Sequence, residues 1–281
     1  MNYRHSYHAG NFADVVKHAV VALILDYLKR KDKAFCVLDT HAGAGRYDLA
    51  GEAAEKTGEW RNGIGRLWGR AGLPRELGPY LAAIRRLNRA GAGTLRWYPG
   101  SPRLTRILMR PQDRLIACEL HPAEAQALQR EFAGDAQARV QRMDGYQALK
   151  AHLPPAERRG LVLVDPPFEE KGEFDRMLAG LDEARRRWAQ GVFAFWYPIK
   201  APGEIERFHK GVIDLGIKRV IAAEILVRPA DDSERLNGAG LLTVNAPWTL
   251  ADDLARLLPY LAEAFADPGP GSARVERLVG E

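Results

Sequence analysis

Residues 161–168 read LVLVDPPF, an apolar run that leads directly into an acid, two prolines and an aromatic side chain. A short β-branched run bounded by such breakers predicts a buried strand. In a parallel sheet wrapped by helices, ligands bind at the carboxyl ends of the strands. We therefore expect a functional site where this strand meets Asp165.

Similar apolar runs alternate with helical patterns along the chain. Ala13–Lys29 is predicted to form a buried helix, because its middle is apolar nearly all round. Seven strands are predicted, at Phe35–Thr40, Arg114–Leu120, Arg139–Met143, Gly160–Asp165, Val192–Tyr197, Arg219–Val227 and Gly240–Asn245. This order predicts an α/β, Rossmann-like fold with a seven-stranded, mostly parallel sheet whose last strands form an antiparallel hairpin.

One interval is too long for a simple crossover. The first predicted strand ends near Thr40 and the second begins near Arg114, whereas a helix and short loops would suffice. We therefore expect a main domain of residues 1–50 and 99–281, with a small helical subdomain, residues 51–98, inserted into it. Inside the insertion, Tyr80–Ala90 is predicted to be a short helix.

The composition, with 46% apolar and 27% charged residues, is typical of a soluble globular protein. No apolar run approaches the roughly 20 residues of a membrane span, and the N-terminus lacks the apolar core of a signal peptide. Cys36 and Cys118 are too few for a disulfide scaffold and lie in apolar runs, so we expect them to be buried. The seven histidines show no metal-ligand spacing. These features predict a cytoplasmic protein with no metal and no membrane partner; a monomer is the default expectation.

Positive charge is concentrated in one part of the chain. Thirteen of the 41 Lys and Arg residues lie between Lys56 and Arg114, against three acids, whereas the rest of the chain is net negative. Arginine pairs with phosphate in a bidentate way, so such a field attracts polyanions. Solvated helix faces also carry arginine, and the charge alone leaves both interpretations open.

The residues after the strand at 160–165 form a receptor for a planar amine. Pro166 and Pro167 fix φ and have no N–H, so the loop carbonyls face outward without competing donors. The Asp165 carboxylate and the Pro166 carbonyl then accept two N–H bonds, while Phe168 offers a flat face for a ring. A strand followed by a structural turn and a core phenylalanine is the alternative, and the position at a strand end argues against it.

These residues look like the Asp/Asn-Pro-Pro-aromatic signature of amino-group methyltransferases that act on adenine or cytosine. The whole chain resembles the RlmJ-type 23S ribosomal RNA adenine-N6 methyltransferases. The resemblance rests on YRHSYHAGN at residues 3–11, LDTHAGAGRY at 38–47, YPGSP at 98–102 and ELHP at 119–122, and it extends essentially from end to end. It implies a class I methyltransferase fold, S-adenosyl-L-methionine as cofactor and 23S ribosomal RNA as partner.

Within that resemblance, the cofactor is expected at the strand ends. Gly43 and Gly45 form a Gly-rich turn, but Asp48 stands where a dinucleotide fingerprint has its third glycine, which disfavours nicotinamide and flavin. Glu119 is suited to accept both ribose hydroxyls. Asp144 is suited to accept from the cofactor's adenine, which Gly145 allows to approach closely. The resemblance adds cofactor contacts for His18, His41, Ser101 and Asp165.

The N-terminus mixes aromatic and cationic groups, which suits base stacking and phosphate contact. Tyr3, Arg4 and His5 are therefore expected to contact the substrate RNA, and the resemblance implies a site-lining role for Lys17. The string Trp196-Tyr197-Pro198 is expected to pack in the core rather than to wall the pocket. The string Asn245-Ala246-Pro247-Trp248 is interpreted as a turn.

Two other functions remain open. DNA adenines offer the same amino group, so a DNA adenine-N6 methyltransferase is the first alternative; the small arginine-rich insertion and the resemblance favour RNA. The second is a non-catalytic RNA-binding protein of ribosome assembly, against which the intact Asp165, Glu119 and Asp144 argue. A base inside a helix cannot reach such a pocket, so the target adenine is expected to be unpaired or flipped out.

Overall fold

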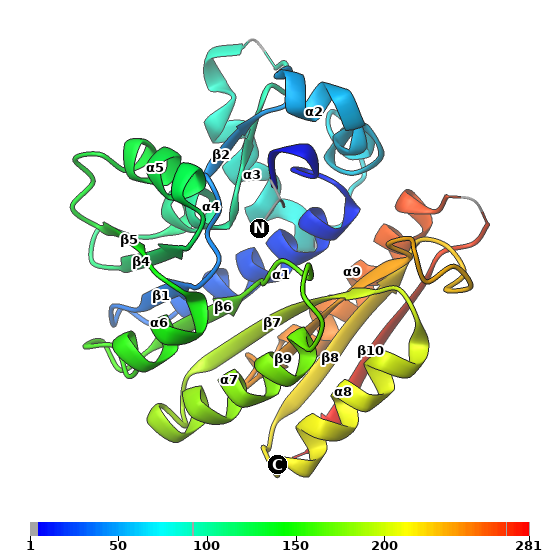
Figure 1. Ribbon diagram of the computed structural model, residues 1–281. Helices are drawn as coiled ribbons and strands as arrows, with labels where there is room; N and C mark the ends of the chain where they lie inside the picture. Colours follow the sequence, from blue (N-terminus) through cyan, green and yellow to red (C-terminus); the bar gives the residue numbers. More distant parts are fainter. Residues whose placement is uncertain (1–4, 92, 268, 281) are drawn as a thin grey trace.

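Eight strands form one sheet at the centre of the computed structural model, which describes residues 5–91, 93–267 and 269–280 (Figure 1). In spatial order they are β10 (Ser272–Val279), β8 (Val220–Leu226), β9 (Gly238–Val244), β7 (Val192–Ile199), β6 (Gly160–Val164), β1 (Cys36–Asp39), β4 (Arg114–Glu119) and β5 (Ala138–Arg142). The five strands from β7 to β5 are parallel, and β9 runs antiparallel to both β7 and β8. The predicted α/β, mostly parallel sheet with a terminal hairpin is confirmed.

The prediction of seven strands was one short, because it omitted β10. This strand pairs antiparallel with β8 at the edge of the sheet, and about half of its residues are solvent-exposed. Its sequence, SARVERLV, alternates charged and apolar residues after a Gly- and Pro-rich turn. An edge strand covered on one face lacks the continuous apolar run of a central strand, so its signal was weak.

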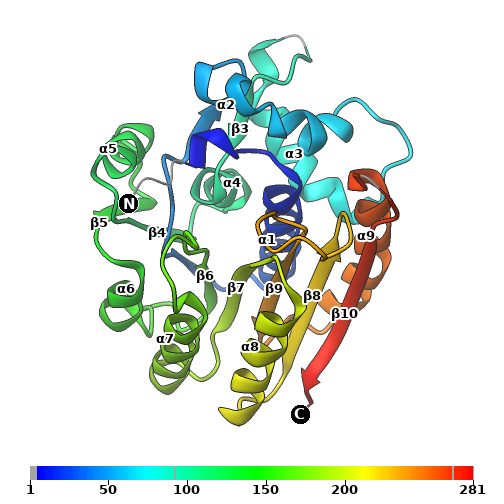
Figure 2. The ribbon, with the colours of Figure 1, turned by 45° about the vertical axis from the view of Figure 1, so that its right-hand side comes forward.

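Helices cover both faces of the sheet (Figure 2). One face carries α1 (Phe12–Lys29), α4 (Ser101–Leu108) and α9 (Leu250–Phe265), with α5 (Pro122–Glu131) packed beside β4 and β5. The other carries α6 (Gly145–His152), α7 (Glu173–Arg187) and α8 (Pro202–Asp214). Among the described residues, no helix combines the length and hydropathy needed to cross a bilayer.

Helix α1 is the central element of the first face. The Asn11 side chain caps it by accepting from the Asp14 N–H, and almost every following residue up to Leu25 is buried. Its N-terminal end lies at the carboxyl ends of the strands. Polar side chains of α1 are therefore buried beside the residues that end β1 and β6.

Residues 51–96 lie between the two strands of a small ribbon, β2 (Arg46–Asp48) and β3 (Trp97–Pro99), so the predicted insertion 51–98 ends inside β3. They form α2 (Glu52–Thr57), α3 (Gly78–Leu87) and 3-10 turns at Glu59–Asn62, Ile64–Arg66, Arg75–Leu77 and Arg89–Gly91. The Tyr80 and Ile84 side chains of α3 are buried, and α3 packs on α1 and α4. That this segment is a separate inserted subdomain remains a prediction.

Candidate active site

A cavity of about 490 Å³ lies at the carboxyl ends of the parallel strands. Its walls come from segments far apart in the sequence: the N-terminal segment His5–Asn11, helix α1, and the loops that follow β1, β4, β5, β6 and β7. This is the position at which open α/β sheets bind ligands.

The predicted amine receptor forms one wall. Asp165, Pro166, Pro167 and Phe168 all line the cavity directly after β6. The Phe168 ring meets the Trp196 ring edge to face, with 6.0 Å between centroids. A base that stacks on Phe168 would therefore have a second aromatic group beside it.

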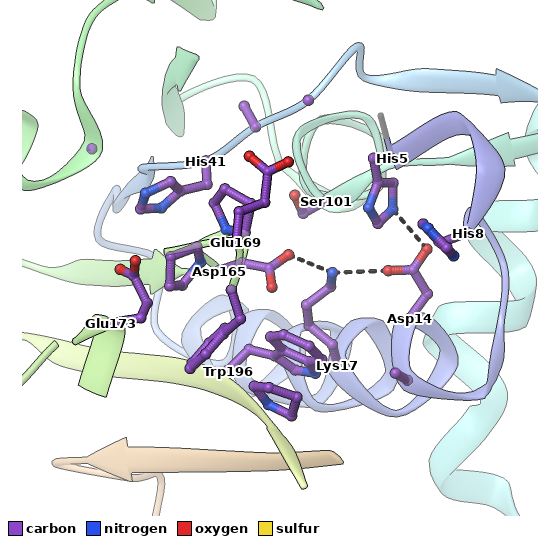
Figure 3. A pocket seen from close by; sticks show the side chains of 18 of the residues that line it. His5, His8, Asp14, Lys17, His41, Ser101, Asp165, Glu169, Glu173 and Trp196 are labelled. Atoms are coloured by element: carbon purple, nitrogen blue, oxygen red, sulfur yellow. Dashed lines mark hydrogen bonds and ion pairs between the residues drawn. The ribbon is translucent and has the colours of Figure 1, made fainter. Parts of the chain in front are cut away.

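Helix α1 places a buried cation, Lys17, beside Asp165. Lys17 Nζ lies 2.5 Å from Asp165 Oδ2 and 2.8 Å from Asp14 Oδ1, and the Lys17 side chain is only 4% exposed (Figure 3). Burial alone would lower the pKa of Lys17, but the two carboxylates raise it above its ordinary value. Lys17 therefore stays charged, with both carboxylates as partners.

The Asp14 carboxylate also joins the N-terminal segment His5–Asn11 to this ion pair. His5 Nε2 lies 2.9 Å from Asp14 Oδ2, and the Gly10 N–H donates to the same oxygen. Burial alone would raise the pKa of Asp14, but His5 and Lys17 hold it well below its usual range. His5, Asp14, Lys17 and Asp165 thus form one continuous polar chain.

The turn after β1 is fixed by the acid that ends β4. Gly43 has a φ of +60°, and its N–H donates to Glu119 Oε2 at 2.8 Å. A side chain at position 43 would also meet the Tyr47 hydroxyl at 2.3 Å. The other Glu119 oxygen accepts from the His121 N–H at 2.7 Å. Each carboxylate oxygen has a further lone pair, so Glu119 can still accept from a ligand.

His41 is a hydrogen-bond acceptor toward the cavity. The Thr40 hydroxyl donates its one hydrogen to the Leu163 carbonyl, so it must accept from His41 Nδ1 at 2.8 Å. Burial lowers the pKa of His41 to about 4, so the ring is neutral and its Nε2 has a free lone pair. Gly145 permits this position, because a Cβ there would lie 2.6 Å from the His41 ring.

Two more buried groups line the opposite side. His18 is stacked on Tyr98 and its Nδ1 lies 2.9 Å from the Tyr98 hydroxyl. Burial lowers the pKa of His18 to about 3, so it is neutral at physiological pH. Ser101 is 5% exposed and opens α4 beside it. His18 and Ser101 therefore add two uncharged polar groups to the cavity lining.

Comparison with known proteins assigns the chain to a family. The family model described as "Ribosomal RNA large subunit methyltransferase D, RlmJ" matches residues 32–279. Two proteins named "Ribosomal RNA large subunit methyltransferase J", from Escherichia coli and Haemophilus influenzae, are 44% and 43% identical over the full length of both chains. The chain belongs to the RlmJ family. It is therefore a methyltransferase.

Solved structures share the fold of this chain. A Legionella pneumophila protein of 34% identity superimposes with a TM-score of 0.88, over 96% of this chain and 98% of that one. A probable spermidine synthase from Corynebacterium glutamicum has a TM-score of 0.51 and 11% identity, over 96% of this chain and 77% of that one. The second likeness concerns the fold alone.

The cavity of this RlmJ family member contains most of the residues predicted for the site. Tyr3 and Arg4 lie outside the described residues. Gly45 does not line the cavity; it packs on α5, where a Cβ would meet Leu128 at 2.9 Å. The remaining predicted residues all line the cavity: His5, Lys17, His18, His41, Gly43, Ser101, Glu119, Asp144, Gly145 and Asp165 to Phe168. Their contacts with cofactor and RNA remain predictions.

Some of these residues also have a structural role that the sequence did not reveal. Asp144 caps α6 by accepting from the Tyr146 and Gln147 N–H groups through one oxygen, Oδ1. The interpretation of Trp196 and Pro198 as core residues was wrong, because both line the cavity. Tyr197 between them is buried in the core, since alternate residues of a strand face opposite sides.

Sequence reasoning missed several buried acids, among them Asp14 and Glu173 in the lining of the RlmJ cavity and Asp39 next to it. Asp14 is held one turn before Lys17, and this i, i+3 spacing is the signal that was available. Asp39 ends β1, as Asp165 follows β6, and is fully buried. Burial raises the pKa of Asp39 to about 7. Among the described residues, no group of three His, Cys, Asp or Glu side chains has an arrangement that could hold a metal ion.

Proposed function

We propose that this protein transfers a methyl group from S-adenosyl-L-methionine to the N6 amino group of an adenine in 23S ribosomal RNA. The observation that carries the proposal is the placement of Asp165, Pro166 and Phe168 together on one wall of the cavity. The two relatives, which cover the whole chain, are named as methyltransferases of large-subunit ribosomal RNA, and this supports the choice of substrate.

The residues on the other walls fit the cofactor. Glu119 would hold the ribose hydroxyls, Asp144 and Gly145 the adenine, and His18 and Ser101 the remaining polar groups. The fit is supported by Asp39, a fully buried carboxyl group next to this lining: burial raises its pKa, although hydrogen bonds from the Ser101 hydroxyl and the His41 N–H act in the opposite direction. A cationic ligand group nearby would lower the cost of that burial. When bound, S-adenosyl-L-methionine supplies an electrophilic methyl group.

The chain's own residues prepare the amino nitrogen. Lys17 occupies Oδ2 of Asp165, which leaves Oδ1 and the Pro166 carbonyl to accept the two amino hydrogens. When both amino hydrogens are hydrogen-bonded to these two oxygens, a pyramidal nitrogen is favoured. Its lone pair then points to the methyl donor. Positioning of this kind is the main contribution to rate.

The proton leaves through the same carboxylate. A neutral aromatic amine is too weak an acid for Asp165 to deprotonate, but the nitrogen becomes cationic and acidic once the methyl group is attached. Asp165 then accepts the proton. Lys17 does not act as the base, because its two carboxylate partners keep it protonated.

Mass spectrometry of nucleosides tests the proposal. Unmodified 23S ribosomal RNA, and DNA of matching sequence, are incubated with the protein and isotopically labelled cofactor, and then digested. Labelled N6-methyladenosine from RNA is the expected product. Label only in DNA would support a DNA methyltransferase, and RNA binding without label would support a non-catalytic assembly protein; either result overturns the proposal.

A further inference from the structure

We propose that Glu59 is a positioning residue, which holds the N-terminal segment His5–Asn11 across the catalytic cavity. Glu59 lies in a 3-10 turn directly after α2, outside the cavity lining, whereas His8 and Asn11 belong to that lining. The inference rests on the proposed function and concerns how the segment 51–98 acts on the site.

Glu59 holds the segment through both of its carboxylate oxygens. His8 Nδ1 lies 2.9 Å from Oε1, and Asn11 Nδ2 donates to Oε2 at 3.0 Å. The hydrogen bond with Glu59 raises the pKa of His8 above its ordinary value. Hydrogen bonds with a charged partner are stronger than neutral ones, so this contact is well suited to fix an otherwise irregular segment.

Asn11 connects Glu59 to helix α1 through two hydrogen bonds. Its Oδ1 accepts from the Asp14 N–H and so caps the helix, while its Nδ2 donates to Glu59. The two partners together fix the orientation of the Asn11 amide. Asp14, whose N–H meets this cap, is also the residue that pairs with Lys17 beside Asp165. Glu59 is therefore two hydrogen bonds away from the chain of charges at the catalytic acid.

Further hydrogen bonds connect the N-terminal segment His5–Asn11 to residues 57–64. The Ile64 N–H donates to the Gly10 carbonyl at 2.9 Å, and the Thr57 hydroxyl donates to the Tyr7 carbonyl. A Cβ at Gly63 would lie 2.1 Å from the Gly10 oxygen, so only glycine allows this approach. The contact runs the whole length of the segment, and Glu59 provides its charged part.

The competing explanation is that residues 51–98 serve only to attract RNA phosphates. In that case Glu59 is an unfavourable negative charge in a basic region, and its removal should tighten RNA binding without slowing methyl transfer. A positioning role predicts the reverse: a fall in kcat, with RNA affinity changed little.

The test compares Glu59→Ala and Glu59→Gln with Glu55→Ala as matched control. Glu55 also lies in the segment 51–98, but it pairs with Arg61 on the surface. The readouts are kcat and KM for RNA methylation, cofactor affinity, and hydrogen exchange of the backbone amides of residues 5–11. Glu59→Ala should lower kcat about tenfold or more and speed exchange in this segment. Glu59→Gln should retain most activity, because its oxygen still accepts from Asn11 and its amide donates to an unprotonated His8 ring.

Several outcomes would overturn the inference. The first is a Glu59→Ala variant with wild-type kcat and wild-type hydrogen exchange. The second is a fall in kcat that is equally large in Glu59→Ala and Glu59→Gln. The third is a fall in kcat in Glu55→Ala as large as that in Glu59→Ala. Should Glu59→Ala not fold, Glu59→Asp keeps the charge but shortens its reach to His8 and Asn11, and wild-type kcat and exchange in that variant overturn the inference as well. Failure of the proposed function looks different: the wild-type protein would methylate no RNA, while Glu59→Ala would still exchange faster.

Discussion

Lys17 Nζ and Asp165 Oδ2 lie 2.5 Å apart, although the two residues are separated by 148 positions in the sequence. The contact brings helix α1 and the loop after β6 together at the proposed catalytic residue. Lys17 uses one acceptor position on Oδ2 of Asp165, so Oδ1 is the oxygen best placed for the substrate in the proposed mechanism. In that mechanism the N-terminal helix is part of the reaction centre.

The role of Asp165 predicts a clean separation of binding from chemistry. Asp165→Ala should lower methyl transfer by 10³-fold or more, while RNA binding is retained. The variant should stay folded, because Lys17 keeps Asp14 as its partner. Single-turnover assays with a melting curve check this, and near-normal turnover would contradict the mechanism.

Lys17→Met should destabilise the protein by about 3–5 kcal/mol, the usual cost of removing one partner from a buried ion pair. The variant leaves two buried carboxylates, Asp14 and Asp165, without their shared cation. Denaturant unfolding at pH 7 measures the change. The double variant Asp14→Asn/Lys17→Met should regain part of the loss, because it removes one of the two charges; a double variant no more stable than Lys17→Met would mean that charge is not the cause.

Asp39 predicts a pH-dependent stability. Its pKa is raised by burial from 3.8 to about 7, so the carboxyl group is protonated in the folded protein where it is ionised in the unfolded one. A raised pKa of this kind supports the fold below about pH 4, and that support is lost as the pH rises to 7. Asp39→Asn should therefore gain stability over the wild type, by up to about 4 kcal/mol, between pH 4 and pH 7. If the free energy of unfolding of the two proteins varied with pH in the same way, the pKa of Asp39 would not be raised in the folded protein.

Glu119→Gln and Glu119→Ala separate ligand binding from local structure. The carboxylate accepts from the Gly43 and His121 N–H groups as well as from the proposed ribose. Gln keeps one acceptor oxygen and Ala keeps none. We expect cofactor affinity to fall about tenfold or more in Glu119→Ala and less in Glu119→Gln, with RNA affinity unchanged in both. Calorimetry decides this, and unchanged cofactor affinity would leave Glu119 a structural residue.

The sequence predicted those parts of the site that are local. The residues 165–168 lie in one unbroken stretch, and Glu119 and Asp144 follow directly from the ends of two strands. The rule that parallel strands end at one edge then places them together. By contrast, the link from Glu59 to His8 joins residues 51 positions apart and depends on how the segment 51–98 folds back. No periodicity or motif records such a contact.

The basic residues between Lys56 and Arg114 show the same limit of prediction from sequence. Arg66, one of these arginines, donates to the Ala264 and Ala266 carbonyls at the end of α9, and Arg61 pairs with Glu55. Several others from this stretch, including Arg96, Arg106, Arg110 and Arg114, pair with carboxylates. Charge counted along the sequence therefore overstates the charge available to RNA, because pairing is decided by tertiary structure.

The arginines of α3 and the turn after it are the best remaining candidates for phosphate contact. Arg85 and Arg86 of α3 and Arg89 of the following turn are exposed and have no carboxylate partner among the described residues, although Arg86 also donates to the Ile107 carbonyl. Replacing all three with alanine should weaken RNA binding without changing cofactor affinity. Each lost phosphate contact should flatten the slope of log affinity against log salt by about 0.7 to 0.9.

The matched control removes the same charge far from the cavity. Lys150 lies near the end of α6, Lys210 lies in α8 and Lys218 precedes β8; all three are exposed, have no ion pair among the described residues and lie outside the cavity lining. Filter binding at several salt concentrations compares the two triple variants. A flatter slope only in the α3 variant places these arginines at the RNA interface, because both variants change the net charge equally. An unchanged slope there would mean that α3 serves only to pack Tyr80 against α1 and α4, and RNA contact would then have to come from the rim of the cavity itself.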